Sequence, residues 1–356
     1  MDIETAIVPP ETLAGEAKQR SHLLEWVFLV FAFAVLALGR NAPAVRTLSL
    51  LFSSIVLEAL PFMLLGAFVG GLVETFVSRE RMASLLPRRQ WLAVLVAAGL
   101  GVVFPVCECA VVPVVRRLAR KGLPVPAVIA YLLGAPIANP IVAVSTAVAY
   151  RFDWLIVASR FFVGYGIAVG IGLAAGHIFR GRAVFVDAIH DGEESASSCA
   201  CDRPGHEADA HLVRGVLGLV VRLGESLRHA ADDFLGVGHY FVIGAFVAAF
   251  AQTLIDRNVF LKVTGQPLAA IVLMMALAVA INLCSEADAF VASSFRGLMP
   301  LSAQMAFVLL GPILDLKLLL MYQTLFRRRV IVTLASLMIA AVLAAALALH
   351  ATGRFG

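Results

Sequence analysis

Charged residues are scarce in this 356-residue chain. Only 15% of the residues are Asp, Glu, Lys or Arg, whereas 61% are hydrophobic and the mean hydropathy is +0.92. A soluble globular domain carries about 25% charged residues, so the composition excludes that class. The sequence therefore predicts an all-α polytopic membrane protein.

Motifs for nucleotide-driven or catalytic chemistry are also missing. The chain has no phosphate-binding Walker motif, no dinucleotide fingerprint and no Ser-His-Asp arrangement in a recognisable context. These absences argue against an ATP-driven pump formed by this chain alone. We expect no enzymatic activity, no cofactor and no nucleic-acid partner, with the lipid bilayer as the surroundings and the oligomeric state left open.

Long hydrophobic runs dominate the rest of the chain. Each approaches or exceeds the roughly 20 residues that a helix needs to cross the hydrocarbon layer. The charged residues before the first run are mostly acidic, which is the wrong charge for a secretory signal, so we expect that run to stay as an anchor helix. The runs lie near 23–39, 47–77, 91–115, 124–150, 153–178, 234–256, 266–295, 301–326 and 330–350.

Three short sequences recur in the same order, which predicts an internal repeat. Leu65-Gly66-Ala67-Phe68-Val69 returns as Ile243-Gly244-Ala245-Phe246-Val247, and two Gly/Pro breaks return in the same way. Paired broken segments at matching places indicate the binding site of a transporter. The predicted divisions are a tail and anchor helix (1–46), a first membrane repeat (47–179), a polar loop (180–230) and a second repeat (231–350).

The distribution of Lys and Arg selects a topology. If all nine runs cross the membrane, the basic residues are spread against the positive-inside rule. If 91–115 and 266–295 instead enter and return as hairpins, most of the basic residues share the cytoplasmic side. The second repeat is then inverted relative to the first, and the two hairpin tips meet near the middle of the membrane.

The two predicted tips carry thiols and carboxylates where lipid-facing residues would be apolar. The first is Cys107-Glu108-Cys109, and the second runs from Asn282 to Asp288 and contains Cys284. Neighbouring prolines favour an extended backbone at the first tip, in which both thiols point the same way. Thiolates prefer soft ions such as Cu(I), Zn(II) or trivalent arsenic, so the three cysteines are candidate metal ligands. Alternatively, they pack as small apolar residues.

Carboxyl groups inside apolar segments are costly and are usually functional. Glu58, Glu108, Glu286 and Asp288 are candidates for coupling transport to protons, or alternatively for locking the tips by hydrogen bonds. Arg160 lacks an obvious local partner and could pair with one of them. The full predicted substrate site comprises Cys107, Glu108, Cys109, Asn139, Asn282, Cys284, Ser285, Glu286, Asp288 and Asp315.

The polar loop offers a second, weaker metal tract. Cys199, Cys201 and His206 are of the residue types that bind zinc, but their spacing is irregular. The alternative is a solvated linker, since the surrounding residues are small and acidic and have little to bury.

The motifs of residues 104–124, 134–142 and 282–295 resemble those of a widespread predicted permease family (YraQ/YcgR-like), which is similar to ArsP-type efflux permeases for trivalent organoarsenicals. The resemblance covers nearly the whole chain after the first run. It implies an inner-membrane permease with Cys107 and Cys109 as candidate substrate thiols.

These observations favour secondary-active efflux of a soft metal ion or metalloid, inorganic or organic. Two alternatives stay open. The first is a permease for a small anion such as a sulfur oxyanion, because helix N-termini at the tips attract negative ligands. The second is a membrane thiol redox protein, because a Cys-x-Cys disulfide would be strained and labile.

Overall fold

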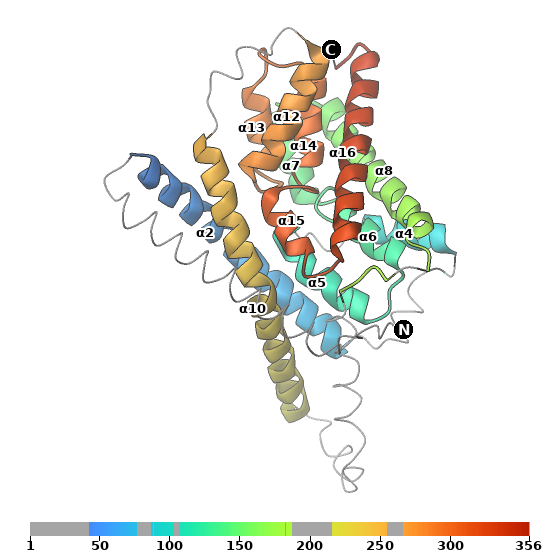
Figure 1. Ribbon diagram of the computed structural model, residues 1–356. Helices are drawn as coiled ribbons and strands as arrows, with labels where there is room; N and C mark the ends of the chain where they lie inside the picture. Colours follow the sequence, from blue (N-terminus) through green and yellow to red (C-terminus); the bar gives the residue numbers. More distant parts are fainter. Residues whose placement is uncertain are drawn as a thin grey trace, which may run out of the picture. The chain divides into compact units, whose positions relative to one another are not determined.

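The computed structural model describes residues 43–76, 87, 89–102, 107–181, 183–186, 216–254 and 266–355. In these ranges the chain is nearly all helical, as the composition predicts (Figure 1). It divides into two compact units, Met1–Leu51 and Phe52–Gly356. The account below concerns the second unit. The predicted metal tract at Cys199, Cys201 and His206 and the predicted anchor helix lie outside the described residues.

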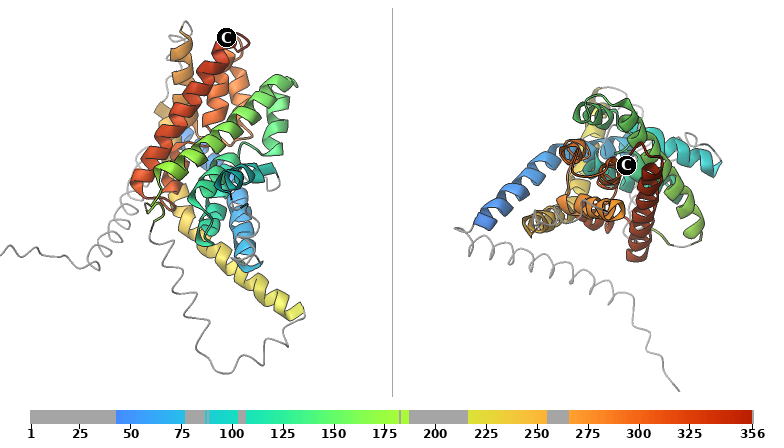
Figure 2. Two further views of the ribbon diagram at one scale, coloured as in Figure 1. Left: turned by 90° about the vertical axis from the view of Figure 1, so that its right-hand side faces the viewer. Right: turned by 90° about the horizontal axis from the view of Figure 1, so that it is seen from above.

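Within the described ranges, four helices contain stretches long and apolar enough to cross a membrane: Val45–Gly71, Trp154–Ile178, Phe234–Thr253 and Arg328–Ala351. They belong to α2 (Pro43–Phe76), α8 (Trp154–Ile178), α10 (Val216–Leu254) and α16 (Arg328–Ala351). Their bounds agree with the predicted runs, except that α10 starts within the predicted polar loop. Helices α8 and α16 pack against each other (Figure 2).

The other described helices are much shorter, because Gly, Pro and polar residues interrupt the apolar runs. At 1.5 Å per residue, a helix of about 10 residues covers only about half of the hydrocarbon layer. In chain order they are α4 (Gln90–Gly99), the 3₁₀ turn η1 (Leu100–Val102), α5 (Glu108–Arg120), α6 (Val125–Gly134), α7 (Pro140–Ala149), α12 (Pro267–Ile281), α13 (Asp288–Ser294), α14 (Leu301–Leu310) and α15 (Leu316–Tyr322).

Helices α4 and α6 run in the same direction, which fixes the path of the first predicted hairpin. Gly176 of α8 lies against both Gln90 and Pro126, so α4 and α6 start at the same level. At their other ends, Gly134 lies against the backbone of Ala98. Since α5 leads into α6, the segment from α4 to α5 enters and leaves at one end of the unit. This is the path of a re-entrant hairpin.

The helices of the two halves follow one another in matching order. Helix α4 packs on α6 as α12 packs on α14, and Figure 1 shows α4, α5 and α6 below α12, α13 and α14. The matched turns Gly122 (φ 83°) and Gly297 (φ 82°) both adopt the left-handed conformation that favours glycine. Asn139 and Asp315 occupy matched N-cap positions, at the starts of α7 and α15. These correspondences agree with an inverted repeat, which stays a prediction.

Basic residues gather at one end of the unit. At this end, the segment after α8 pairs with the segment before α16, since Arg327 N donates to Val184 O. The start of α4 lies at the same end, because Gln90 contacts Gly176 near the end of α8. At the other end, Arg296 pairs with Asp153 and Ser302 N donates to Phe355 O. Among the described residues, the first end carries Arg89, Arg116, Arg117, Arg120, Lys121, Arg180, Arg327, Arg328 and Arg329, whereas the other carries Arg151, Arg296 and Arg354.

Candidate functional site: a pocket of thiols and charges

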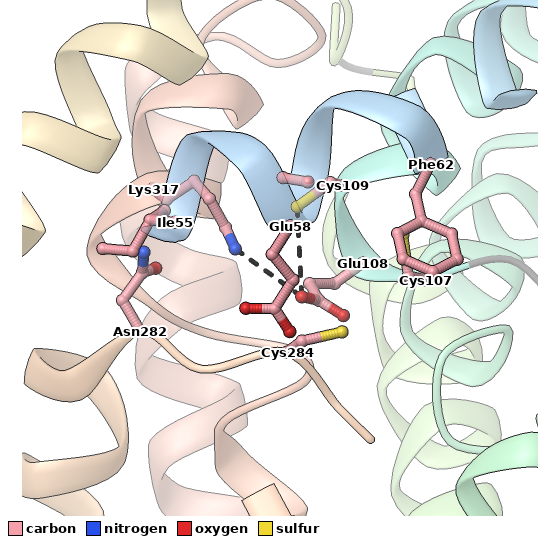
Figure 3. A pocket seen from close by; sticks show the side chains of 10 residues that line it. Ile55, Glu58, Phe62, Cys107, Glu108, Cys109, Asn282, Cys284 and Lys317 are labelled. Carbon is pink, nitrogen blue, oxygen red and sulfur yellow. Dashed lines mark hydrogen bonds and ion pairs between the residues drawn. The ribbon is translucent and has the colours of Figure 1, made fainter. Parts of the chain in front are cut away.

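Residues from both halves of the chain line a small pocket with a cavity volume of about 10 Å³ (Figure 3). The first half contributes α2 and the start of α5, and the second half contributes the loop after α12 and the start of α15. The polar lining therefore comes from the two predicted tips and from two helices beside them. The lining residues are Ile55, Glu58, Ala59, Phe62, Cys107, Glu108, Cys109, Asn282, Cys284 and Lys317.

The backbone at the first tip differs from the prediction. Cys107 is extended (φ −73°, ψ 168°), but α5 begins at the next residue and continues through Pro113, so the expected extended stretch across Cys109 is wrong. In a membrane, backbone groups have to be satisfied internally. One hydrogen bond lost at a proline costs less than a longer unpaired stretch. Both thiols still line the pocket, because one precedes the helix and the other lies in its first turn.

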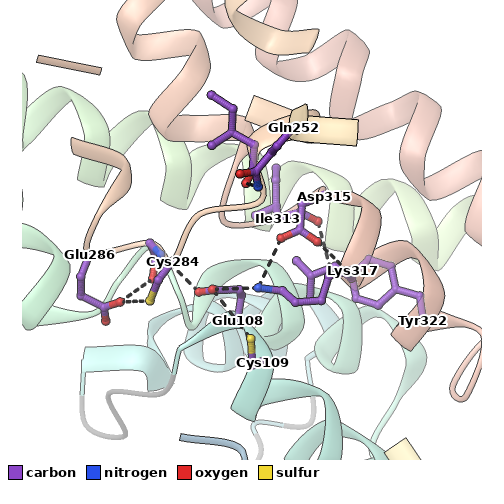
Figure 4. A network of polar contacts seen from close by, with 12 residues as sticks. Glu108, Cys109, Gln252, Cys284, Glu286, Ile313, Asp315, Lys317 and Tyr322 are labelled. Carbon is purple, nitrogen blue, oxygen red and sulfur yellow. Dashed lines mark hydrogen bonds and ion pairs between the residues drawn. The ribbon is translucent and has the colours of Figure 1, made fainter. Parts of the chain in front are cut away.

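An ion-pair cluster centred on Lys317 joins the two halves (Figure 4). The Lys317 Nζ atom lies 3.5 Å from Glu108 Oε1 and 3.7 Å from Asp315 Oδ2. The side-chain exposures are 3% for Lys317 and 1% for each carboxylate. With its amide oriented to donate, Asn282 Nδ2 lies 2.6 Å from Asp315 Oδ2. The contact of Lys317 with Glu108 could not be read from sequence spacing, because the two residues lie in different halves of the chain.

Side chains from four helices hold the second tip. Glu108 Oε2 accepts a hydrogen bond from Ser285 N at 3.4 Å, and Arg160 Nη2 donates to Ser285 O at 3.0 Å. Ser145 Oγ donates to Glu286 O, and Gln252 Nε2 donates to Ile281 O. Neither Ser145 nor Gln252 was predicted, because a polar residue that supports a distant loop carries no local sequence signal.

The predicted site residues do not all meet in the pocket. Asn139 caps α7 through a 2.9 Å bond from Ile141 N, and Asp315 caps α15 through a 2.5 Å bond from Leu318 N while also contacting Lys317. The carboxylate of Glu286 accepts from the Cys284 thiol. Asp288 starts α13, is buried, and has no hydrogen-bond partner for Oδ2.

The structure brings Cys107, Cys109 and Cys284 to one pocket, all three as free thiols. Within the described ranges, however, no three or more His, Cys, Asp or Glu side chains are already grouped to hold a metal ion. The predicted thiol ligand set therefore stays a prediction. Arg160 donates to the Ser285 carbonyl and, at 2.8 Å, to Thr146 Oγ1, rather than forming the expected pair with a carboxylate.

Half-length helices that end at a charged pocket, beside longer helices able to span a bilayer, are the arrangement typical of a membrane permease. The chain belongs to the family described as "Predicted permease", whose profile matches residues 44–351.

Two relatives illustrate this membership. The chain is 37% identical over 300 residues to the UPF0718 protein YcgR of Bacillus subtilis (strain 168), covering 84% of this chain and 96% of that protein. It is 34% identical over 281 residues to a putative two-component membrane permease complex subunit of Streptococcus mutans serotype c (strain ATCC 700610 / UA159), covering 79% of this chain and 87% of that protein. No solved structure matches the chain.

Proposed function

We propose that this permease exports a soft metal ion or metalloid by secondary-active alternating access. The observation that carries the proposal is the meeting of three buried thiols and the buried Glu108 with the exposed Glu58 in one pocket lined by both halves. Thiolate and carboxylate oxygens together suit Zn(II), and thiolates alone suit Cu(I) and trivalent arsenic. The end rich in Arg and Lys is the cytoplasmic side in this proposal.

The charge balance of the pocket favours a cation over an anion as cargo. Among the described residues that line the pocket, Glu58 and Glu108 are acidic and only Lys317 is basic. Beside the pocket lie Asp315, in contact with Lys317, and Arg160, which donates to Ser285 O. In a low dielectric, an excess of carboxylates is stabilised by a bound cation or by protons and repels an anion. This balance weighs against a sulfur oxyanion as the transported species.

Replacing both Cys107 and Cys109 with serine is expected to abolish binding of zinc, Cu(I) and arsenite by the detergent-purified protein. Serine keeps the size and the hydrogen bonds but supplies no soft ligand. Equilibrium binding measures the effect, with Cys199→Ser/Cys201→Ser as the matched control that should bind like the wild type. If the wild type binds none of the three probes, the cargo proposal fails, and a thiol redox role should then be tested by trapping a Cys107–Cys109 disulfide.

Efflux is expected to depend on a proton gradient, with Asp288 as the proposed proton carrier. Its side chain is buried with one oxygen unpaired, and a neutral carboxyl group avoids the cost of such burial. The charges that act on it belong to Arg160, Glu108, Asp315 and Lys317.

Proteoliposomes test this coupling. Imposing an inward proton gradient should accelerate cargo efflux several-fold in the wild type and have no effect in Asp288→Asn. Asp153→Asn, at the surface end of α8, is the control that should respond like the wild type. Efflux that is indifferent to the gradient in the wild type would rule out proton coupling.

A further inference from the structure

The contacts of Lys317 suggest a role for this residue in the transport cycle itself. We propose that Lys317 is an internal counter-cation that occupies the place of the cargo on Glu108 whenever the pocket is empty. The inference rests on the proposed function, because it concerns what happens when a cationic cargo leaves. It assigns a separate role to a residue that is not a ligand of that cargo.

The first step of the argument is the position of the ammonium group. Lys317 Nζ lies 3.5 Å from an oxygen of Glu108, in a pocket that Cys107, Cys109 and Cys284 also line. A cation bound by those thiols and by Glu108 would have to take the place that Nζ now holds near the carboxylate. Cargo and lysine are therefore competitors for one oxygen ligand.

The second step is that Lys317 has a second carboxylate to which it can withdraw. Asp315 Oδ2 lies 3.7 Å from Nζ, in a different direction from Glu108 (Figure 4). Asp315 is held in place by the N–H of Leu318 and by the amide of Asn282. When cargo binds Glu108, the ammonium group of Lys317 can therefore move away and still keep Asp315 as a counter-charge.

The third step is the difference between the two halves. Asn139 and Asp315 occupy matched N-caps, and the residue two positions later is Ile141 in the first half but Lys317 in the second. Fold symmetry therefore does not require a charge here. Burying a lysine costs free energy, and only the second half carries one at this position. Exchange with a cationic cargo would account for its presence.

The consequence concerns the return of the empty carrier. A carrier whose pocket holds an uncompensated carboxylate has to carry a buried charge through its closed state, which is costly in a low dielectric. When Lys317 pairs with Glu108, the negative charge of Glu108 is balanced in the empty pocket as it is by the cargo in the loaded one. Removing the lysine should then block net transport, which requires an empty return, but not exchange, in which the carrier always moves loaded.

The variant Asp315→Asn/Lys317→Met tests this in proteoliposomes. It removes one charge of each sign, so the net charge of the cluster is unchanged, and Asn is the cap that the first half uses. We expect net efflux of radiolabelled zinc to fall about tenfold or more, with zinc exchange within about twofold of the wild type. Zinc binding should tighten about tenfold, since about 1.4 kcal/mol of competition is removed. A parallel set uses radiolabelled arsenite.

Asp153→Asn, which lies outside the pocket at the start of α8, is the control and should retain both net efflux and exchange. Single Asp315→Asn should weaken zinc binding, because Lys317 loses the carboxylate to which it withdraws. Net efflux that persists in the double variant overturns the inference, and so does a loss of exchange together with net efflux in protein that still binds zinc. If the double variant does not elute as a single species, Lys317→Gln is judged by the same criteria. A wild type that neither binds nor moves zinc or arsenite instead refutes the proposed function, and the inference with it.

Discussion

Lys317→Met is expected to lower the free energy of unfolding by about 3–5 kcal/mol, the cost typical of breaking a buried ion pair from one side. The variant leaves Glu108 and Asp315 buried, each 1% exposed, without the cation that both contact. Glu108 also accepts from Ser285 N, so its displacement should loosen the second tip. Thermal unfolding in detergent, compared at one pH, measures the loss.

A double-mutant cycle gives the control for this prediction. Glu108→Gln/Lys317→Met removes both charges of the pair and should recover most of the stability lost in the single variant. Asp315 then keeps the hydrogen bonds from Leu318 N and from the Asn282 amide. The contrary result is that Glu108→Gln lowers the free energy of unfolding by the same amount in the wild type and in Lys317→Met. The two residues would then be independent, and their ion pair would contribute nothing to stability.

Gly134→Ala is expected to destabilise the protein by about 1–3 kcal/mol, toward the upper end of the range for overpacking. A Cβ atom at this position would lie 2.5 Å from Ala98 O and 2.8 Å from Ala98 Cα. Both are backbone atoms, so no side chain can turn aside and α4 and α6 have to separate. Because α4 leads into the tip that carries Glu108, cargo binding should weaken as well.

Gly166→Ala on α8 is the matched control for Gly134→Ala. A Cβ atom there meets nothing within 4 Å, and alanine favours a helix by up to about 1 kcal/mol over glycine. This control should therefore unfold at the temperature of the wild type or slightly above it. Equal unfolding temperatures for Gly134→Ala and the wild type would show that the close approach of α4 and α6 does not limit stability.

Composition and hydrophobic runs predicted the fold class and the approximate bounds of α2, α8 and α16. A helix in lipid has to be apolar over a length set by the bilayer, so the spanning stretches of α8 and α16 can be recognised from their hydrophobic runs alone. The Gly and Pro breaks likewise marked where long runs divide, as at Gly134 and Gly311. Local backbone chemistry determines these features, and no tertiary contact is needed to recognise them.

The candidate site was predicted less completely. The sequence indicated Glu108 and the three cysteines Cys107, Cys109 and Cys284, because charged and thiol side chains are unusual within an apolar run. It did not indicate that Glu286 and Asp288 lie outside the pocket lining, or that α5 starts at Glu108 and makes the first tip helical across Cys109. The prolines favoured an extended tip, but the need to pair backbone groups in an apolar medium outweighed that preference.

The sequence by itself determined that this is a helical membrane protein with broken, thiol- and carboxylate-bearing segments in each half, because burial in lipid restricts residue types position by position. Only the tertiary structure decided which charges meet. Lys317 contacts Glu108, 209 positions away in the chain, because α15 packs beside α5. Ion pairs between distant segments depend on how those segments pack, and the sequence of either segment alone does not specify that packing.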